Sequence, residues 1–378
     1  MDRKAKILLT GGGSGGHIYP LIAISEELYK LAENKELNLD LRYAGYCGQY
    51  ERLLLDHGIK VYKIPGSKFR RYFSPANLFE GPRLVFGFVR AFFVVATFKP
   101  GAVFSKGGPG ALPVVWAASA LKIPIVIHES DSIPGMTSLM TARFAKKVAV
   151  SFVSSEKYFP GKYVLTGNPV REDLFDDADI SQEEAKKLLG FNSAMPLIFF
   201  FGGSQGAIRL NNFVTDNLIR LTGKWQILHQ TGKANYDKIA DEEKGKNIRN
   251  YRSVPYLDKE MGLAFRAADL VVSRAGSGSI FEIAAFGKPS ILIPLPEAAQ
   301  NHQLKNAEEY AGSGAAIVVE ENKLDIDGFI SAINDILSIP EREKKMSDAA
   351  RGFSKPKAAS DVVGIIYSII NNKHITTP

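Results

Sequence analysis

The sequence predicts an α/β protein made of two doubly wound parallel sheets. Short apolar runs alternate with amphipathic stretches along the chain, which is the pattern of strand-helix-strand units. At 378 residues the chain exceeds what one hydrophobic core usually supports. Each half also begins with an apolar strand that runs into a glycine-rich turn.

In the first half, six strands and one long helix are expected. The helix runs from about His17 to Lys30, because apolar residues recur on one face. The strands are expected at residues 6–10, 41–44, 102–105, 123–128, 148–151 and 163–166.

The second half repeats this architecture after a turn-rich crossing at 166–171 and an acidic stretch at 172–179. Ser181 and Glu184 form a capping-box pattern that opens a new helix. Strands are expected at residues 197–201, 225–229, 270–273, 290–293 and 315–319.

Composition narrows the class of partner. The net charge of +7 and pI near 9.1 suggest an anionic partner, namely nucleic acid, a phosphate-rich ligand or an anionic membrane. No nucleic-acid-binding module is recognised, so no nucleic acid is expected. The single Cys47 excludes an internal disulfide and fits a reducing cytoplasm. A spanning helix is not expected, because Arg90 interrupts the longest apolar run, Leu84 to Phe98.

Glycine-rich turns follow several of the expected strands. Residues 11–16 match the G-x-G-x-x-G pattern, with Glu36 or Asp40 about twenty residues beyond, so a nicotinamide-dependent dehydrogenase stays open. Similar turns occur at 105–110 and 201–206. Three phosphate-sized turns in two domains suit a cleft better than one dinucleotide site. Ser204 and Gln205 stand where they grip a pyrophosphate or simply cap a helix.

A fourth turn, residues 273–279, leads into an apolar helix. Glu282 is expected in its first turn. The helix dipole stabilises a carboxylate there with or without a ligand, and the position also suits two ribose hydroxyls.

Together these motifs resemble the MurG family of UDP-N-acetylglucosamine transferases, which complete lipid II in bacterial cell-wall synthesis. The resemblance covers nearly the whole chain. Its supporting strings are residues 10–17, 128–131, 167–171, 202–207, 274–279 with Glu282, and 300–303.

The resemblance implies a GT-B fold, in which two Rossmann-like domains face each other across a cleft and the C-terminal helix crosses back to the first domain. Residues 1–168 with about 358–378 would form the acceptor and membrane-associated domain. Residues 169–357 would bind the UDP-sugar donor.

The implied reaction moves N-acetylglucosamine, with inversion, from UDP-GlcNAc to the 4-hydroxyl of N-acetylmuramic acid in lipid I. The backbone near Leu257 would meet the uracil, and Glu282 the ribose. The other implied substrate-binding residues are Ser14, Gly15, Gly16, Asp131, Arg171, Ser204, Gln205, Ser277, Gly278, Ser279 and Gln303. The sequence departs from many relatives at Asp131, where they carry Asn, and at Pro109 to Ala111, where they carry an aromatic or Tyr-Val-Ser-like segment.

An inverting transfer needs a base that takes the proton of the acceptor hydroxyl. His17 is the expected base, because the N-terminus of a helix keeps an imidazole neutral. Glu129 is the alternative base, or it orients the acceptor. No cofactor or metal is expected, since no Asp-x-Asp pair stands at a strand end.

A lipid acceptor requires a membrane surface. Residues 68–73 mix cations and aromatics, and apolar segments follow at 84–88 and 92–95. This predicts an interfacial segment on an anionic bilayer, at the cytoplasmic face of the plasma membrane, although a buried core helix explains the same pattern. A cell-wall synthesis complex is a further implied partner. Transfer to another lipid or polysaccharide, and a non-catalytic sugar-nucleotide-binding or scaffold role, remain alternatives.

Overall fold

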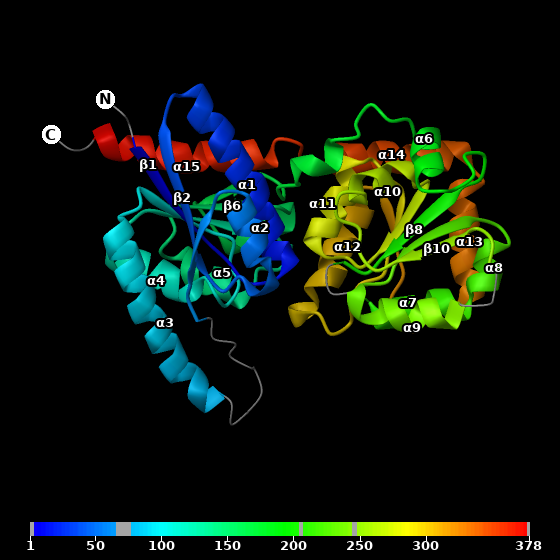
Figure 1. The fold of residues 1–378 in the computed structure, drawn as a ribbon, viewed down its shortest axis with the longest axis horizontal. Coiled ribbons are helices and arrows are strands. Elements are labelled where there is room, and N and C mark those ends of the chain that lie inside the picture. Colours follow the sequence, from blue (N-terminus) through cyan, green and yellow to red (C-terminus); the bar gives the residue numbers. More distant parts are fainter. Residues whose placement is uncertain (1–3, 66–76, 204–206, 244–247, 376–378) are drawn as a thin grey trace. The chain divides into compact units, whose positions relative to one another are not determined.

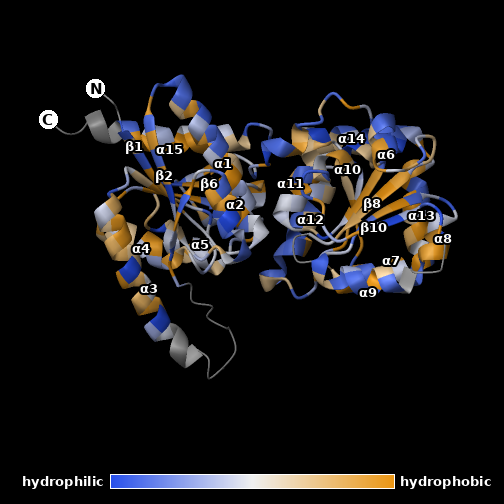
Figure 2. Cartoon of the chain, in the orientation of Figure 1, coloured by the Kyte–Doolittle hydropathy of each residue, from blue (hydrophilic) through white to orange (hydrophobic). Residues whose placement is uncertain are grey.

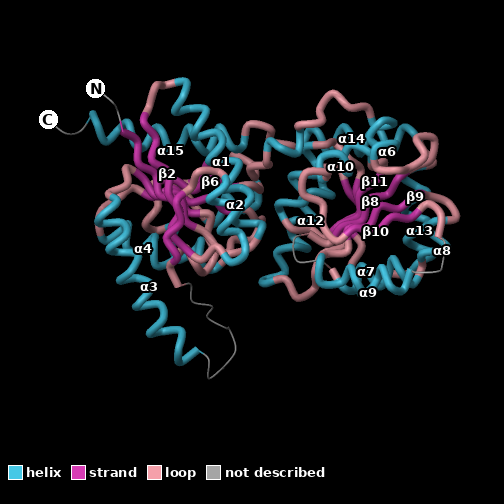
Figure 3. The backbone as a smooth tube through the Cα atoms, in the orientation of Figure 1, coloured by secondary structure: helices cyan, strands magenta, loops and turns pink. Residues whose placement is uncertain are grey.

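The computed structural model describes residues 4–65, 77–203, 207–243 and 248–375. It divides into two compact units, Met1–Arg171 with Lys355–Pro378, and Glu172–Ser354 (Figure 1). Each unit is a parallel sheet with helices on both faces (Figure 3). The predicted α/β class and its two doubly wound sheets are confirmed.

The first unit contains a seven-stranded parallel sheet in the order β3-β2-β1-β4-β5-β6-β7. The sequence analysis missed β3, a four-residue edge strand in which both end residues are lysines, too short and too polar to stand out. The strands are β1 Lys4–Thr10, β2 Asn38–Gly45, β3 Lys60–Lys63, β4 Ala102–Ser105, β5 Ile125–Glu129, β6 Lys147–Val150 and β7 Tyr163–Leu165.

Helices cover both faces of this sheet, and the last one comes from the far end of the chain. Helix α15 (Ala358–Ile375) packs beside α1 (Gly15–Asn34) and buries Val362, Val363 and Ile366 in the same core. The predicted return of the C-terminal helix is therefore confirmed. The remaining helices are α2 Glu51–Asp56, α3 Asn77–Phe98, α4 Leu112–Ala120 and α5 Met136–Ala142, with short 3₁₀ helices at Gly48–Tyr50 and Val153–Tyr158.

Helix α3 exposes an apolar surface to solvent. Its stretch Gly81–Phe98 is long and apolar enough to cross a membrane by length and composition, with mean hydropathy 1.5. The sequence analysis did not expect such a stretch, because it required an apolar run that Arg90 does not interrupt. One such helix is weak evidence for a membrane span. Figure 2 shows apolar residues along this helix interspersed with polar ones.

The second unit contains a six-stranded parallel sheet in the order β10-β9-β8-β11-β12-β13. Helix α6 (Gln182–Leu188) begins as predicted, since Ser181 Oγ accepts a hydrogen bond from the Glu184 amide at 3.2 Å. The strands are β8 Leu197–Phe201, β9 Gln226–Gln230, β10 Tyr251–Val254, β11 Leu270–Ser273, β12 Ser290–Leu292 and β13 Ala316–Val318. The other helices are α7 Ile208–Asp216, α8 Leu218–Thr222, α9 Lys233–Glu243, α10 Met261–Ala267, α11 Ser277–Ala285, α12 His302–Gly312, α13 Ile326–Leu337 and α14 Pro340–Phe353; 3₁₀ helices lie at Glu172–Phe175, Ala299–Asn301 and Glu321–Lys323.

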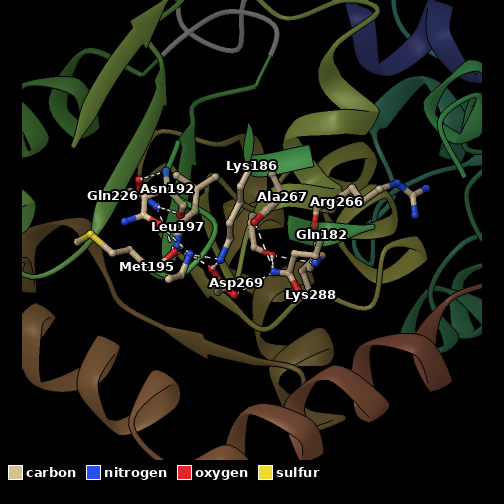
Figure 4. A network of polar contacts seen from close by, with 12 residues as sticks. Gln182, Lys186, Asn192, Met195, Leu197, Gln226, Arg266, Ala267, Asp269 and Lys288 are labelled. Carbon is tan, nitrogen blue, oxygen red and sulfur yellow. Dashed lines mark hydrogen bonds and ion pairs between the residues drawn. The ribbon is translucent and has the colours of Figure 1, made fainter. Parts of the chain in front are cut away.

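A polar network closes the amino edge of this second sheet (Figure 4). Asp269 accepts hydrogen bonds from the Leu197 amide at 2.6 Å and from Gln182 Nε2 at 2.9 Å. It also pairs with Lys186 at 2.8 Å, and the lysine side chain is only 6% exposed. These contacts tie α6 to the starts of β8 and β11, which makes this edge structural.

Each sheet has one switch point, a pair of neighbouring strands at which the strand order reverses direction. The candidate site loops follow the carboxyl ends of these strands. The reversal lies between β1 and β4 in the first unit and between β8 and β11 in the second. Open parallel sheets bind ligands in the loops outside such a switch point. Residues 11–14 and 106–111 are those loops in the first unit, and residues 274–276 form one of them in the second.

Candidate active site

His17 stands in the first turn of α1, directly after the loop that follows β1. Its Nδ1 lies 2.7 Å from the Oγ of Ser14, the residue at the N-cap position of the helix. When Nδ1 donates to Ser14, Nε2 is the nitrogen that carries the lone pair. The Ser14 hydroxyl makes no bond to the helix amides, so it orients the imidazole instead of capping α1.

The glycines around His17 are explained by loop packing. A Cβ built on Gly12 would stand 2.9 Å from His17 Nδ1, and one on Gly108 would stand 3.0 Å from Nε2. Gly13 packs in the same way against the ring of Tyr46. Gly16 has open space, since its Cβ would meet nothing within 4 Å. Of these glycines, Gly16 leaves room for a ligand.

The pKa of His17 is lowered to about 4. Loss of hydration inside the packed loops is the main cause, the ammonium of Lys106 adds to it, and the Asp131 carboxylate opposes it. His17 as a whole residue is half-buried. Its imidazole is neutral at neutral pH.

Glu129, at the end of β5, is buried and holds the loop that follows it. Its Oε1 accepts from the Asp131 amide at 3.0 Å and its Oε2 from the Gly135 amide at 3.2 Å. Burial and the charge of Asp131 raise the pKa of Glu129, while the hydrogen bonds from the Asp131 amide and the Ser138 side chain and the charge of Lys106 oppose the rise. Both carboxyl oxygens are engaged with the chain, which favours the orienting role over that of base.

Lys106 is a buried residue that the sequence analysis did not single out. It lies in the turn after β4 and is 3% exposed, and its Nζ donates to Ser130 Oγ. Ser130 Oγ in turn donates to Asn168 Oδ1 at 3.3 Å. A lysine inside the glycine-rich turn at 105–110 was the signal that could have found it.

The motifs at 128–131 and 167–171 meet in the structure. His128 Nε2 donates to the Gly167 carbonyl at 2.9 Å. Arg171 is 7% exposed, and its guanidinium lies over the Tyr19 ring at 4.4 Å. The sequence therefore brings Arg171 back to α1, where it packs against an aromatic ring.

In the second unit, α11 begins at the switch point with an open end. Gly276 occupies the cap position without a side-chain cap, and neither Gly276 nor Gly278 would place a Cβ within 4 Å of another atom. Ser277, Gly278 and Ser279 form the first turn. The amides of such a turn are suited to an anion.

Glu282 is the sixth residue of α11, so its predicted place in the first turn was wrong. The helix begins at Ser277, earlier than the expected start after residue 279, so Glu282 falls in its second turn. In the loop before the helix, Arg274 is held by the carbonyls of Ile293 and Pro294 and by an ion pair with Glu321. Stabilisation of Glu282 by the helix N-terminus therefore falls away as a reason for its position.

Two other residues predicted to contact the UDP-sugar already form hydrogen bonds within the chain. Gln303 Oε1 accepts from the Leu295 amide at 3.0 Å, and the Leu257 amide donates to Gln230 Oε1 at 2.8 Å. Both bonds hold loops at the carboxyl edge of the sheet. Ser204 and Gln205, and the basic aromatic segment 68–73, lie outside the described residues.

The dehydrogenase interpretation requires an acid at the carboxyl end of β2. Asp40 stands near the amino end of that strand, opposite Lys6 of β1, and pairs with Arg42 at 2.8 Å. Glu36 precedes the strand altogether. Neither acid reaches the switch point.

The two sheets, the returning C-terminal helix and the site loops at the strand ends are those of a GT-B fold. The N-terminal domain model of glycosyltransferase family 28 matches residues 7–150, and the C-terminal domain model of the same family matches residues 197–362. The chain belongs to glycosyltransferase family 28.

The chain is similar to curated proteins named UDP-N-acetylglucosamine--N-acetylmuramyl-(pentapeptide) pyrophosphoryl-undecaprenol N-acetylglucosamine transferase. That of Clostridium tetani is 36% identical over 334 residues, 88% of this chain and 89% of that protein. That of Caldanaerobacter subterraneus is 36% identical over 369 residues, 96% of this chain and 100% of that protein. The crystal structure of Acinetobacter baumannii MurG superposes with a TM-score of 0.72 at 26% identity, covering 96% of this chain and 99% of that one.

Proposed function

We propose that this protein transfers N-acetylglucosamine from UDP-GlcNAc to the 4-hydroxyl of N-acetylmuramic acid in lipid I, forming lipid II and releasing UDP. The observation that carries the proposal is the similarity, over nearly the full chain, to transferases named for this reaction. The alternative of a nicotinamide-dependent dehydrogenase is not supported, because neither Glu36 nor Asp40 stands where an acidic residue would bind the ribose of the cofactor.

The second unit is proposed to bind the donor. The open first turn of α11, with Gly276 and Gly278 free of neighbours, accommodates a pyrophosphate without a steric obstacle. Glu282, one turn further along the helix, is proposed to bind the ribose, and Gln303 to reach the sugar through its amide nitrogen. At Leu257 the uracil would use the carbonyl, or compete with Gln230 for the amide.

The first unit is proposed to bind the acceptor and to supply the base. His17 Nε2 takes the proton of the acceptor hydroxyl as its oxygen attacks the anomeric carbon, and the bond from that carbon to UDP breaks on the opposite face. The neutral state of His17 supports this role. Glu129 shapes the loop beside it, and Asp131 presents a partly exposed carboxylate to the acceptor side.

The first experiment measures UDP release from UDP-GlcNAc with and without a soluble lipid I analogue, in the presence of a chelator. Release is expected only with the acceptor, and His17→Ala is expected to lower it by about a hundredfold or more. If the protein binds UDP but shows no acceptor-dependent UDP release, the assignment of lipid I as the acceptor is refuted. Full activity of His17→Ala would leave the transferase assignment intact but would refute the role of His17 as the base.

Peripheral attachment to an anionic membrane is also proposed. Val85, Phe86 and Phe93 of α3 are 63%, 60% and 63% exposed, and Arg83 and Arg90 are exposed on the same helix. Apolar side chains flanked by cations suit an interface with anionic lipid. Met136, Leu139 and Met140 of α5 are exposed as well.

Vesicle sedimentation tests this attachment. The double change Phe86→Ser with Phe93→Ser is expected to weaken binding to vesicles containing phosphatidylglycerol by about tenfold or more. Ile219→Ser is the control, because Ile219 is 82% exposed but belongs to the second unit. Equal binding by the double variant and the control would contradict the proposal.

A further inference from the structure

Arg274 is a buried cation of the second unit with no role in the reaction proposed above. It follows β11 directly, and its side chain is 7% exposed. Its Nη1 donates to the Ile293 carbonyl at 3.2 Å and to the Pro294 carbonyl at 3.3 Å, both in the segment that follows β12. Its Nη2 donates to Glu321, which lies beyond β13 and whose side chain is 6% exposed. One guanidinium therefore joins the segments that follow three neighbouring strands.

The Pro294 carbonyl and the Leu295 amide belong to the same peptide group, and each makes a different hydrogen bond. Arg274 binds the carbonyl, whereas the Leu295 amide donates to Gln303 Oε1 at 3.0 Å. A peptide group is rigid and planar, and in the trans form found here its carbonyl and its N–H point in opposite directions. Fixing the Pro294 carbonyl therefore also fixes the direction of the N–H that Gln303 accepts.

The same contact decides which way the Gln303 amide faces. A backbone N–H can only donate, so the oxygen of the Gln303 amide must face Leu295, and the Nε2 donor points away from it. Nε2 is the atom proposed above to reach the sugar of the donor. A hydrogen bond from a charged guanidinium also polarises the peptide group and strengthens the bond made by its N–H. Arg274 thus acts on Gln303 through one peptide group.

The start of the helix that carries Gln303 depends on contacts of this kind. Gln300 and Asn301, directly before α12, have φ of 55° and 58°, in the left-handed region that residues other than glycine seldom adopt. Asn301 stands at the N-cap position of α12 but makes no side-chain cap. The local sequence therefore does not fix this helix start, and contacts with neighbouring segments have to hold it.

Stability alone is a poor explanation for the buried charges. A buried ion pair is often no more stabilising than apolar side chains of similar volume. To orient a peptide group, in contrast, a side chain needs N–H donors, which apolar side chains lack. We propose that Arg274, held by Glu321, is a positioning residue of the donor site, which orients the Gln303 amide toward the sugar of UDP-GlcNAc through the peptide group of Pro294 and Leu295. This inference rests on the proposed contact of Gln303 with the donor sugar.

The test compares the binding of UDP-GlcNAc and of UDP to the full chain by calorimetry, which needs no acceptor. The double variant Arg274→Met with Glu321→Leu removes both buried charges together, and Arg209 keeps Glu297 as its partner. Its affinity for UDP-GlcNAc is expected to fall about tenfold, the effect of one lost hydrogen bond to the sugar. Its affinity for UDP is expected to stay unchanged, because UDP lacks the sugar and Asn306 Nδ2 still holds the Ala275 carbonyl before α11 at 3.3 Å.

Gln303→Ala distinguishes orientation of the amide from a general loss of structure. Alone, this change is expected to lower the affinity for UDP-GlcNAc about tenfold. Added to the double variant, it is expected to lower the affinity no further, because changes that remove one and the same contact do not add. Additive losses, or a double variant that binds UDP-GlcNAc as the wild type does, would overturn the proposal and leave Arg274 with a packing role.

Arg274→Lys is a second variant that retains the buried charge. A lysine lacks the planar fork that reaches a carboxylate and a carbonyl together, so the same selective loss of UDP-GlcNAc affinity is expected. If both variants lose UDP and UDP-GlcNAc affinity alike, Arg274 serves the fold and the proposal is wrong. Arg220→Met with Asp327→Leu is the matched control, because it removes an exposed arginine–carboxylate pair of the same unit and also leaves the net charge unchanged. It is expected to bind both nucleotides as the wild type does.

Failure of this inference is distinguishable from failure of the proposed function. An unchanged affinity of Gln303→Ala for UDP-GlcNAc would refute the sugar contact and with it the role of Arg274. The transfer reaction itself would still be judged by acceptor-dependent UDP release.

Discussion

Gly108→Ala adds one methyl group beside His17 Nε2, the nitrogen proposed to act as the base. The new Cβ would stand 3.0 Å from His17 Nε2 and 3.0 Å from Gly12 Cα, so the backbone on one side prevents it from moving away and the imidazole must tilt. A displacement of a reacting group by about 1 Å lowers the rate of the chemical step by about a hundredfold. We therefore expect kcat to fall about a hundredfold. The left-handed backbone at Gly108, with φ of +79°, adds about 1–2 kcal/mol of strain for any alanine.

Gly161→Ala separates the strain from the contact. Gly161 has a similar φ of +73°, yet its Cβ would meet nothing within 4 Å. Both variants are therefore expected to lose similar stability in urea unfolding, and only Gly108→Ala to lose UDP release with a lipid I analogue. UDP binding by calorimetry is expected to be unchanged in both. Equal activities of the two variants would refute the placement of the reacting nitrogen at Nε2.

Three further predictions concern stability, pH and the donor. Asp269→Ala leaves the buried Lys186 without its carboxylate partner and is expected to lower the free energy of unfolding in urea by about 3–5 kcal/mol, whereas a loss below about 1 kcal/mol would contradict the network in Figure 4. Burial lowers the pKa of His229 to about 3 and that of His128 well below 6.5. Below pH 6.5 the unfolded chain then binds more protons than the folded chain. The free energy of unfolding is therefore expected to fall by about 1.4 kcal/mol per pH unit for each histidine as the pH drops toward 4. Equal urea midpoints at pH 7 and pH 5 would contradict this prediction. Glu282→Ala is expected to raise KM for UDP-GlcNAc about tenfold or more with little change in KM for the lipid, and an unchanged KM for the nucleotide would remove Glu282 from the donor site.

The sequence predicted the architecture because that information is local. Alternating apolar strands and amphipathic helices mark a doubly wound sheet, and a glycine-rich turn marks the carboxyl end of a strand. Strand β3 was not predicted because its four residues, with lysines at both ends, contain no apolar run. The start of α11 was placed too late because Ser277, Gly278 and Ser279 are residue types that favour turns, yet they form the first turn of the helix.

The composition of the candidate site was harder to predict than its position. His17 was found because a histidine after a glycine turn is visible in the sequence. The reason for Gly12 and Gly108 was not visible, since both pack against the imidazole from different loops. Lys106 was missed for the same reason: its neighbours Ser130 and Glu129 come from the next strand of the sheet.

The return of α15 to the first unit affects the order in which the chain folds. Val362, Val363 and Ile366 belong to the same core as the first helix and strands, yet they follow the whole second unit in the chain. All residues of the second unit, Glu172–Ser354, are synthesised before them. The half that holds His17 therefore completes its core only after the second unit has been made, and a chain that stops short of α15 lacks part of the core of the unit that carries the candidate site.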